Sequence, residues 1–154
     1  MALSDIIKNM SFDEIIKLCC DQEQEAVNLY TELRNRATDD AAKLKFQELV
    51  DMETQHLVNL QTFEIEKYMD LPPANLKVTD YLTEPSKDRN LTTQEALILA
   101  AKREDKTAKL YQDLAHFFKD NVELNTFFQM MADEELRHKH DLETEYEDEF
   151  LQEG

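Results

Sequence analysis

The chain has 154 residues with one glycine, three prolines and no tryptophan, a composition typical of a single all-α domain, here residues 1–154. Its formal net charge is −17 at pH 7, and the 17 basic residues are scattered among 34 acidic ones. This distribution argues against a nucleic-acid partner, because neutralising phosphate groups requires clustered lysine and arginine.

The first half of the chain predicts two helices. Ser11 and Glu14 have the spacing of a capping box and precede an apolar pattern of helical period, which predicts a helix over about residues 12–36. A threonine and two aspartates then mark a new start, and a second helix is expected over about residues 40–69, ending before two consecutive prolines. No segment indicates a strand.

The second half predicts another pair of helices. Thr92 and Glu95 form a second capping-box pattern before a helix over about residues 93–118, and a polar turn leads into a fourth helix over about residues 122–150. Residues 71–91 hold all three prolines and form a crossover linker between the pairs. Because so long a connection can return along the bundle, we expect helices two and three to run in the same direction.

A repeated motif is the strongest signal in the sequence. Glu53-x-x-His56 recurs 82 positions later as Glu135-x-x-His138, within matched flanking residues. A three-residue step keeps the glutamate and the histidine on one helix face, about one turn apart. Glutamate is common in this chain, so one copy would be weak, but two copies at matched positions indicate a built site.

A second repeated pattern lies upstream of each motif. Glu23 precedes Tyr30 by seven residues, and Glu104 precedes Tyr111 by the same step. Seven residues close two helical turns to within about 20°, so each tyrosine shares a face with its glutamate. We expect these phenols to hydrogen-bond carboxylates across the bundle.

These side chains together predict a dinuclear metal site. Four ionised glutamates in a dry bundle centre would repel one another and lose hydration, and two divalent cations would balance their charge. An oxygen-rich set with one imidazole for each ion suits iron or manganese, while zinc could also bind. The alternative is a purely structural bundle whose glutamates and histidines form solvated faces.

Other acidic residues near the motifs are not expected to bind metal. Asp113-x-x-His116 lies outside the repeated frame, and we interpret it as surface. Each histidine ligand should donate from its second ring nitrogen to an acceptor. Asp51, Asp133 and Glu134 are near in sequence, but we expect them on a solvated face.

Cysteine usage and the N-terminus bear on location. Cys19 and Cys20 are adjacent in a predicted helix, where a bridge between them would strain the backbone, so we expect free thiols in a reducing compartment. Residues 1–16 lack a signal-peptide pattern, and the longest apolar run, residues 96–101, is too short to cross a bilayer. We therefore expect a cytoplasmic protein without a membrane partner.

The pattern resembles the ferritin-like superfamily, and most closely its rubrerythrin-type diiron proteins. The resemblance covers about residues 12–150 and implies an up-down four-helix bundle of two helix pairs joined by a long crossover. The matching ligand order is Glu23, Glu53, His56, Glu104, Glu135 and His138. By that resemblance Glu53 and Glu135 would bridge two irons, Glu23 and Glu104 would each bind one, and each histidine would bind one. Tyr30 and Tyr111 match tyrosines beside the ligands of that family.

Two departures affect what carries over. Full-length rubrerythrins resemble this chain followed by a four-cysteine rubredoxin-like module, which the sequence does not contain, so electrons would come from an external donor protein or from iron(II). The family usually carries a further carboxylate three residues after the third-helix ligand, where this chain has Thr107.

Three functions follow as hypotheses. The first is a diiron oxidoreductase that reacts with peroxide or dioxygen in oxidative-stress defence. The alternative is oxidation and sequestration of iron(II), or metal buffering, without a dedicated electron donor. Hydroxylase or desaturase chemistry on an organic substrate stays open, although the chain shows no substrate domain. A small bundle of this kind is expected to pair as a homodimer.

Overall fold

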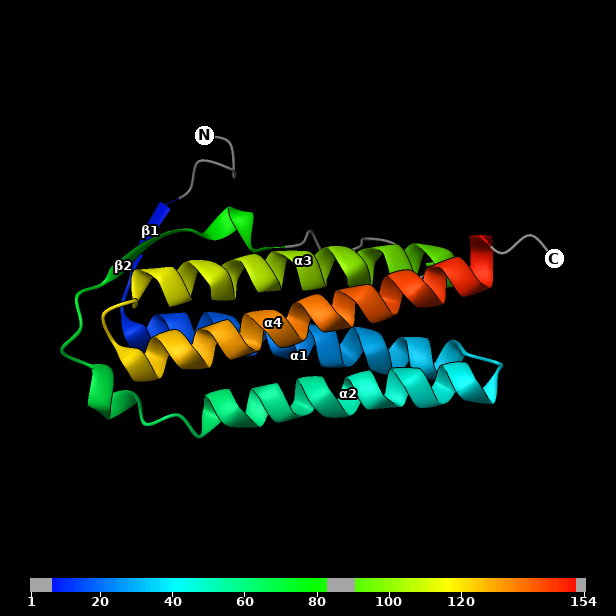
Figure 1. The fold of residues 1–154 in the computed structure, drawn as a ribbon, viewed down its shortest axis with the longest axis horizontal. Helices are drawn as coiled ribbons and strands as arrows, with labels where there is room; N and C mark the ends of the chain where they lie inside the picture. The colour runs from blue at the N-terminus through cyan, green and yellow to red at the C-terminus, as the bar shows by residue number, and fades with distance from the viewer. Residues whose placement is uncertain (1–6, 83–90, 152–154) are drawn as a thin grey trace.

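The computed structural model describes residues 7–82 and 91–151. Over these residues four long helices pack as a bundle of two pairs, α1 with α2 and α3 with α4 (Figure 1). The helices are α1 (Phe12–Arg36), α2 (Asp40–Gln61), α3 (Thr93–Phe117) and α4 (Val122–Tyr146). The predicted all-α bundle of two helix pairs is therefore confirmed.

The two helices of each pair run antiparallel, and α2 and α3 run in the same direction, as the crossover requires. In Figure 1, α1 and α4 run one way along the long axis, and α2 and α3 run the other way. The chain leaving α2 must therefore return along the bundle before α3 begins, which agrees with the expected crossover over residues 71–91. Residues 83–90 of that segment lie outside the described residues.

A small two-stranded sheet was not expected from the sequence. β1 (Ile7–Met10) pairs antiparallel with β2 (Ala74–Lys77), with Ile7 opposite Lys77. In β2 the side chains alternate between buried and exposed positions, with Ala74 and Leu76 buried. Four-residue strands are too short to show that alternation convincingly, and their pairing joins distant parts of the chain.

The second helix ends at Gln61, eight residues before the predicted end. Thr62 is the C-cap residue of α2, and its hydroxyl donates a hydrogen bond to the Val58 carbonyl at 2.9 Å. Beyond it the chain turns through η2 (Ile65–Tyr68), a 3-10 helix. The ring of Tyr68 then packs on Phe12 with a centroid distance of 5.1 Å. Aromatic packing therefore ends the helix, rather than the prolines that follow.

The fourth helix also ends earlier than predicted, at Tyr146 rather than near residue 150. Residues Glu147–Leu151, labelled η4, continue as a π-helical turn. The last turn of α4 contains no basic side chain, and the residues that follow are acidic. Negative charge is unfavourable at a helix C-terminus because the last carbonyl groups carry partial negative charge.

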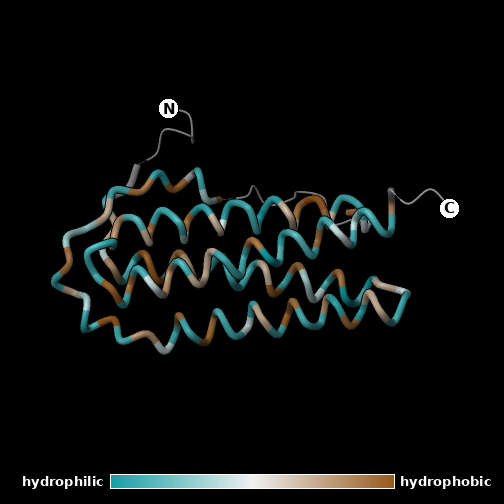
Figure 2. The backbone as a smooth tube through the Cα atoms, viewed as in Figure 1, coloured by the Kyte–Doolittle hydropathy of each residue, from teal (hydrophilic) through white to brown (hydrophobic). Residues whose placement is uncertain are grey.

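Two apolar layers fill the bundle. One lies toward the sheet and η3 (Val78–Asp80), and the other lies toward the α1–α2 turn. Along α2, Phe46 and Leu49 belong to the second layer and Leu60 to the first, and Figure 2 shows the corresponding alternation of hydrophilic and hydrophobic residues along each helix. The apolar spacing along α4 predicts that Phe127, Phe128, Met131, Leu136 and Leu142 line its inner side. Phe128, Met131 and Leu142 are buried and Phe127 is partly buried, but Leu136 is 37% exposed. Polar residues occupy the level between the two layers.

Both predicted capping boxes are present. Ser11 caps α1 with Glu14, and Thr92 caps α3 with Glu95, each through reciprocal hydrogen bonds. Replacing Thr92 by alanine is expected to lower the free energy of unfolding by about 1 kcal/mol, because it leaves helix N–H groups without an acceptor. Urea denaturation measures this effect.

The same substitution at Thr126, an exposed position inside α4, is the matched control. Because alanine has a higher helix propensity than threonine, Thr126→Ala should be neutral or slightly stabilising. Equal losses in the two variants would show that the cap contributes nothing specific.

Candidate metal centre

Six side chains meet at the level between the apolar layers, and each helix contributes at least one of them. α1 and α3 each provide one glutamate, and α2 and α4 each provide a glutamate and a histidine one turn later. All six are at most 2% exposed. They are Glu23, Glu53, His56, Glu104, Glu135 and His138. Their burial contradicts the alternative in which these residues form solvated faces.

The six side chains form two overlapping groups. Glu23, Glu53, His56 and Glu135 can each place a ligand atom within 4.8 Å of the others, and we call this group the His56 position. Glu53, Glu104, Glu135 and His138 do the same, and we call this group the His138 position. The two groups share Glu53 and Glu135. The arrangement therefore suits two neighbouring cations with two carboxylates common to both.

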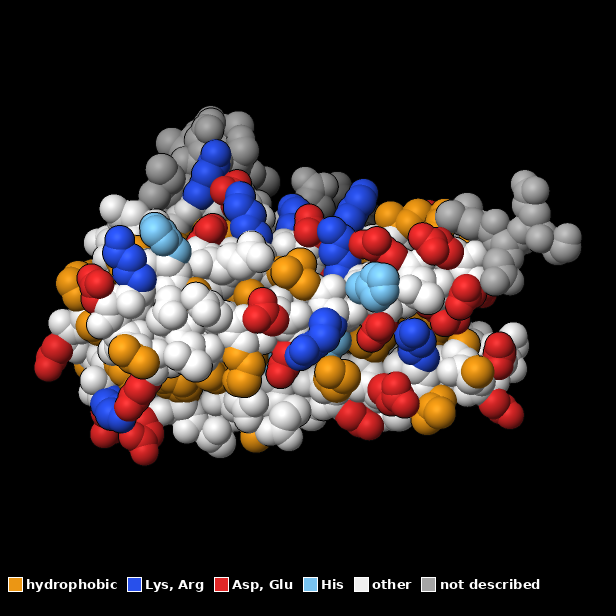
Figure 3. Space-filling view, viewed as in Figure 1, with side chains coloured by type: hydrophobic (Ala, Val, Ile, Leu, Met, Phe, Trp, Pro, Cys, Tyr) orange, Lys and Arg blue, Asp and Glu red, His pale blue; other side chains and the backbone are white. Residues whose placement is uncertain are grey.

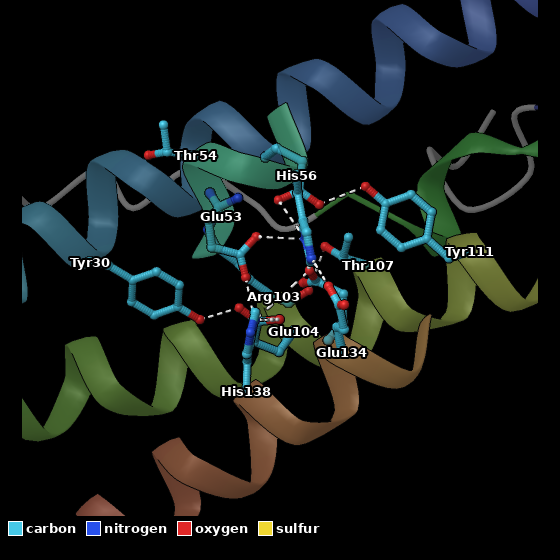
Figure 4. A network of polar contacts seen from close by, with 12 residues as sticks. Tyr30, Glu53, Thr54, His56, Arg103, Glu104, Thr107, Tyr111, Glu134 and His138 are labelled. Carbon is cyan, nitrogen blue, oxygen red and sulfur yellow. Dashed lines mark hydrogen bonds and ion pairs between the residues drawn. The ribbon is translucent and has the colours of Figure 1, made fainter. Parts of the chain in front are cut away.

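Each imidazole presents its Nδ1 atom to the shared carboxylates (Figure 4). His56 Nδ1 lies 2.7 Å from Glu135 Oε1, and His138 Nδ1 lies 2.6 Å from Glu53 Oε1. Each histidine thus approaches the shared glutamate of the opposite helix pair. The two rings are stacked with a centroid distance of 5.7 Å. The centre is therefore symmetric in the atoms that face its interior.

The two buried tyrosines cross-link the helix pairs, as the seven-residue spacing predicted. Tyr30 on α1 donates to Glu104 on α3, and Tyr111 on α3 donates to Glu23 on α1 at 2.6 Å. Burial raises the pKa of both phenols, and the neighbouring Glu104 and Glu23 carboxylates raise them further. Both tyrosines therefore keep their protons and act as hydrogen-bond donors.

Several polar atoms inside the centre lack a hydrogen-bond partner. His56 Nδ1 and Glu135 Oε1 are 2.7 Å apart, and neither atom takes part in a hydrogen bond. Other such atoms are Glu23 Oε2, Glu53 Oε2, Glu104 Oε2 and His138 Nε2. Buried polar atoms without partners are unfavourable, and most of these are carboxylate oxygens that a bound cation would satisfy. The donor set therefore fits hard or borderline metal ions.

The pKa shifts follow from burying so many acids together. Burial raises the pKa of Glu104 to about 8, helped by repulsion from Glu53, and burial also raises the pKa of Glu53 and Glu135. Burial opposes the charged form of His56, but the Glu23 and Glu53 carboxylates, each 3.6 Å from His56 Nδ1, outweigh it and raise the pKa of His56 to about 11. Protons therefore balance part of the negative charge when no cation does so.

The sequence-based prediction was wrong for one residue near the ligands, Glu134. Glu134, expected on a solvated face, has a side chain only 26% exposed, and its carboxylate contacts His56 Nε2 across the bundle. Asp51 and Asp133 are exposed, as expected. The repeat could not have revealed Glu134, because its counterpart in the first copy is Met52. The helix position beside Glu135 was the only available signal.

The Asp113–His116 pair and the two cysteines lie outside the centre. His116 is exposed, and Asp113 accepts a hydrogen bond from the Tyr81 hydroxyl at 2.7 Å. His116 therefore lies on the surface, as predicted, whereas Asp113 is half-buried against Tyr81. Cys19 is buried and Cys20 is partly buried, both as free thiols, and burial raises their pKa values.

Thr107, at the position where rubrerythrin-type proteins usually carry a further carboxylate, donates its hydroxyl to the Arg103 carbonyl at 2.8 Å. That bond engages its one proton with the backbone, and the side chain carries no carboxylate to offer a cation.

Comparison with protein-family models, with curated proteins and with solved structures found no match in any of the three. Within the described residues no helix is both long and apolar enough to span a membrane. On the face drawn in Figure 3, basic side chains lie scattered among acidic ones. The buried centre is therefore the feature of the molecule that bears on function.

Removing either tyrosine hydroxyl is expected to weaken metal binding. Tyr30→Phe leaves Glu104 without its donor, and Tyr111→Phe does the same to Glu23. Loss of a hydrogen-bond partner of a metal ligand lowers affinity by about 10- to 100-fold. Calorimetric titration with manganese(II) measures the change.

Tyr146→Phe is the matched control, because its hydroxyl accepts a hydrogen bond from Gln94 and touches no residue of the centre. This variant should bind manganese(II) as the unmodified chain does. A wild-type affinity in both Tyr30→Phe and Tyr111→Phe would contradict the assigned role of the phenols.

Proposed function

We propose that this chain is a rubrerythrin-type member of the ferritin-like superfamily, a non-haem dinuclear iron protein that reacts with peroxide or dioxygen. The observation that carries the proposal is the pair of overlapping ligand groups that share Glu53 and Glu135. Two carboxylates common to two positions are what the family resemblance implies for bridging ligands. Glu23 and Glu104 would each hold one iron, as would His56 and His138.

The donor set favours iron or manganese over zinc. Four glutamates and two imidazoles give an oxygen-rich set with one nitrogen for each ion, which suits iron or manganese better than a thiolate-rich zinc site. When bound, two iron(II) ions would supply the two electrons that, with two protons, convert one hydrogen peroxide to two waters. Manganese in the cell would instead point to peroxide disproportionation.

The residues of the chain would control where this chemistry takes place. The apolar layers above and below the centre exclude bulk water from it, because their side chains are almost fully buried. Tyr30 and Tyr111 hold the oxygens of Glu104 and Glu23 by hydrogen bonds. The ligands are thus prepositioned, and little reorganisation would accompany a change in the charge of the bound ions.

Rapid mixing tests the redox proposal directly. Protein loaded anaerobically with two equivalents of iron(II) is mixed with hydrogen peroxide, and oxidation is followed by absorbance in a stopped-flow instrument. We expect oxidation faster than for free iron(II) under the same conditions, because the buried centre holds both ions beside prepositioned ligands. A rate no faster than that of free iron(II) would overturn the proposal.

Repeated additions of iron(II) in air separate this function from storage. Saturation at two irons per chain supports a redox centre that needs an external electron-donor protein or iron(II) as reductant. Soluble retention of many more irons per chain supports the alternative, oxidation and sequestration. Sedimentation velocity of the same preparations tests the proposed homodimer.

A further inference from the structure

The two histidines of the centre differ in what lies behind their rings. Nε2 of His56 contacts the carboxylate of Glu134, which reaches across from α4 (Figure 4). Nε2 of His138 is buried and has no hydrogen-bond partner among the described residues. Both rings present Nδ1 to the shared glutamates. The two histidines are therefore alike in the contacts of Nδ1, which faces the shared glutamates, and differ in the contacts of Nε2.

The sequence repeat explains this asymmetry. Glu134 immediately precedes the shared ligand Glu135, and the residue that immediately precedes the equivalent ligand Glu53 is Met52. A carboxylate at position 52 would stand toward His138 as Glu134 stands toward His56, because the two motifs face one another. A thioether is only a weak acceptor and carries no charge. The chain therefore provides a charged acceptor for one histidine only.

An acceptor behind a ligating imidazole changes how that imidazole binds metal. It holds the proton on Nε2, so the lone pair of Nδ1 faces the ion, and it fixes the ring orientation and raises the basicity of the ligand. Loss of such a partner lowers metal affinity by about 10- to 100-fold. Glu134 also brings one more negative charge close to the His56 position.

We propose that the two metal positions are inequivalent and that the His56 position fills first, because Glu134 orients and polarises His56 while His138 has no such partner. This inference rests on the proposed function only in requiring that the buried centre binds two ions. Glu134 is a positioning residue, since it acts through His56. Its exposed neighbour Asp133 offers a matched control on the same helix.

Titration with manganese(II) under anaerobic conditions tests the order of filling. Calorimetry of the unmodified chain should show two steps whose affinities differ by about 10- to 100-fold. Electron paramagnetic resonance at one equivalent should show isolated manganese rather than a coupled pair. Glu134→Ala should bring the two steps together by weakening the first, and Asp133→Ala should leave both unchanged.

The complementary test introduces a carboxylate that can accept a hydrogen bond from His138 Nε2. Met52 is 40% exposed, so a glutamate can be introduced there without burying a new charge completely. Met52→Glu should strengthen the second step by about tenfold or more, since it supplies His138 with a charged partner. Met130 is also exposed but lies on α4. Met130→Glu adds the same charge and should leave the second binding step unchanged.

Histidine variants identify the position that fills first. His138→Ala should keep the tight step, whereas His56→Ala should lose it. Two equal steps that Glu134→Ala does not alter, or loss of the tight step in His138→Ala alone, would overturn the inference and leave the dinuclear proposal standing. Failure of the unmodified chain to bind two ions would overturn both.

Discussion

Replacing Glu53 by alanine is expected to lower the affinity for both metal ions by more than about 100-fold, because loss of a mere hydrogen-bond partner of a ligand already costs about 10- to 100-fold. Glu53 offers ligand atoms to both positions, so one substitution should affect two ions. Metal analysis after gel filtration, combined with manganese(II) calorimetry, measures the result. The expected outcome is loss of both ions together.

Glu48→Ala on the same helix is the matched control, because Glu48 is exposed. It should bind two ions like the unmodified chain. Circular dichroism establishes that both variants keep their helices. If Glu53→Ala retained one ion at full affinity, Glu53 would not be shared, and the overlapping arrangement would be wrong as a description of the metal centre.

The metal-free and metal-loaded proteins are expected to respond to pH in opposite directions. Burial raises the pKa of Glu104 from 4.5 to about 8, so the folded metal-free protein retains a proton that the unfolded chain releases. The stability contributed by that proton is fully present below pH 4.5 and is lost as the pH rises through about 8. At about 1.4 kcal/mol per pKa unit, the loss is on the order of 5 kcal/mol for Glu104 alone.

His56 reinforces this trend at higher pH. The pKa of His56 is raised from 6.5 to about 11, so its contribution is present below pH 6.5 and lost as the pH rises through about 11. Bound metal reverses the dependence, because protons compete with the cation for the same ligands and acidification releases it. The metal-free protein should therefore be more stable at pH 5 than at pH 8, and the loaded protein more stable at pH 8.

The midpoint temperatures of thermal unfolding of the metal-free and metal-loaded proteins, measured between pH 5 and pH 8, test these opposite pH dependences. Glu104→Gln cannot titrate, so the metal-free variant should show a visibly shallower loss of stability toward pH 8. The exposed Glu48→Gln should reproduce the slope of the unmodified chain. A metal-free protein that gained stability as the pH rose would contradict the raised pKa of the buried acids.

The sequence was sufficient to predict the centre because repetition and helical spacing act together. Glu53-x-x-His56 and its copy must each lie on one helix face, and an apolar pattern determines which face is inside. The tyrosine spacing likewise placed Tyr30 and Tyr111 level with the glutamates of the opposite pair. Capping residues located helix starts well, since Ser11 and Thr92 act through local hydrogen bonds.

Features that depend on distant contacts were missed. The early end of α2 reflects packing of Tyr68 on Phe12, and the β1–β2 pairing joins two segments that carry no local strand signal. The contact of Glu134 with His56 depends on how α4 is rotated about its own axis, which spacing alone does not determine. Positions at which the two copies of the motif differ are also informative. Met52 in the first copy is equivalent to Glu134 in the second, and this difference indicates that the two metal positions are not identical.

The division of ligands among the helices has a consequence for how the molecule assembles. Neither the α1–α2 hairpin nor the α3–α4 hairpin holds a complete ligand group, because each position draws on both hairpins. Binding of the ions would therefore strengthen the docking of one hairpin on the other. Amide hydrogen exchange in α2 and α4 should slow together on loading, because the bound metal links the two hairpins in addition to their apolar packing.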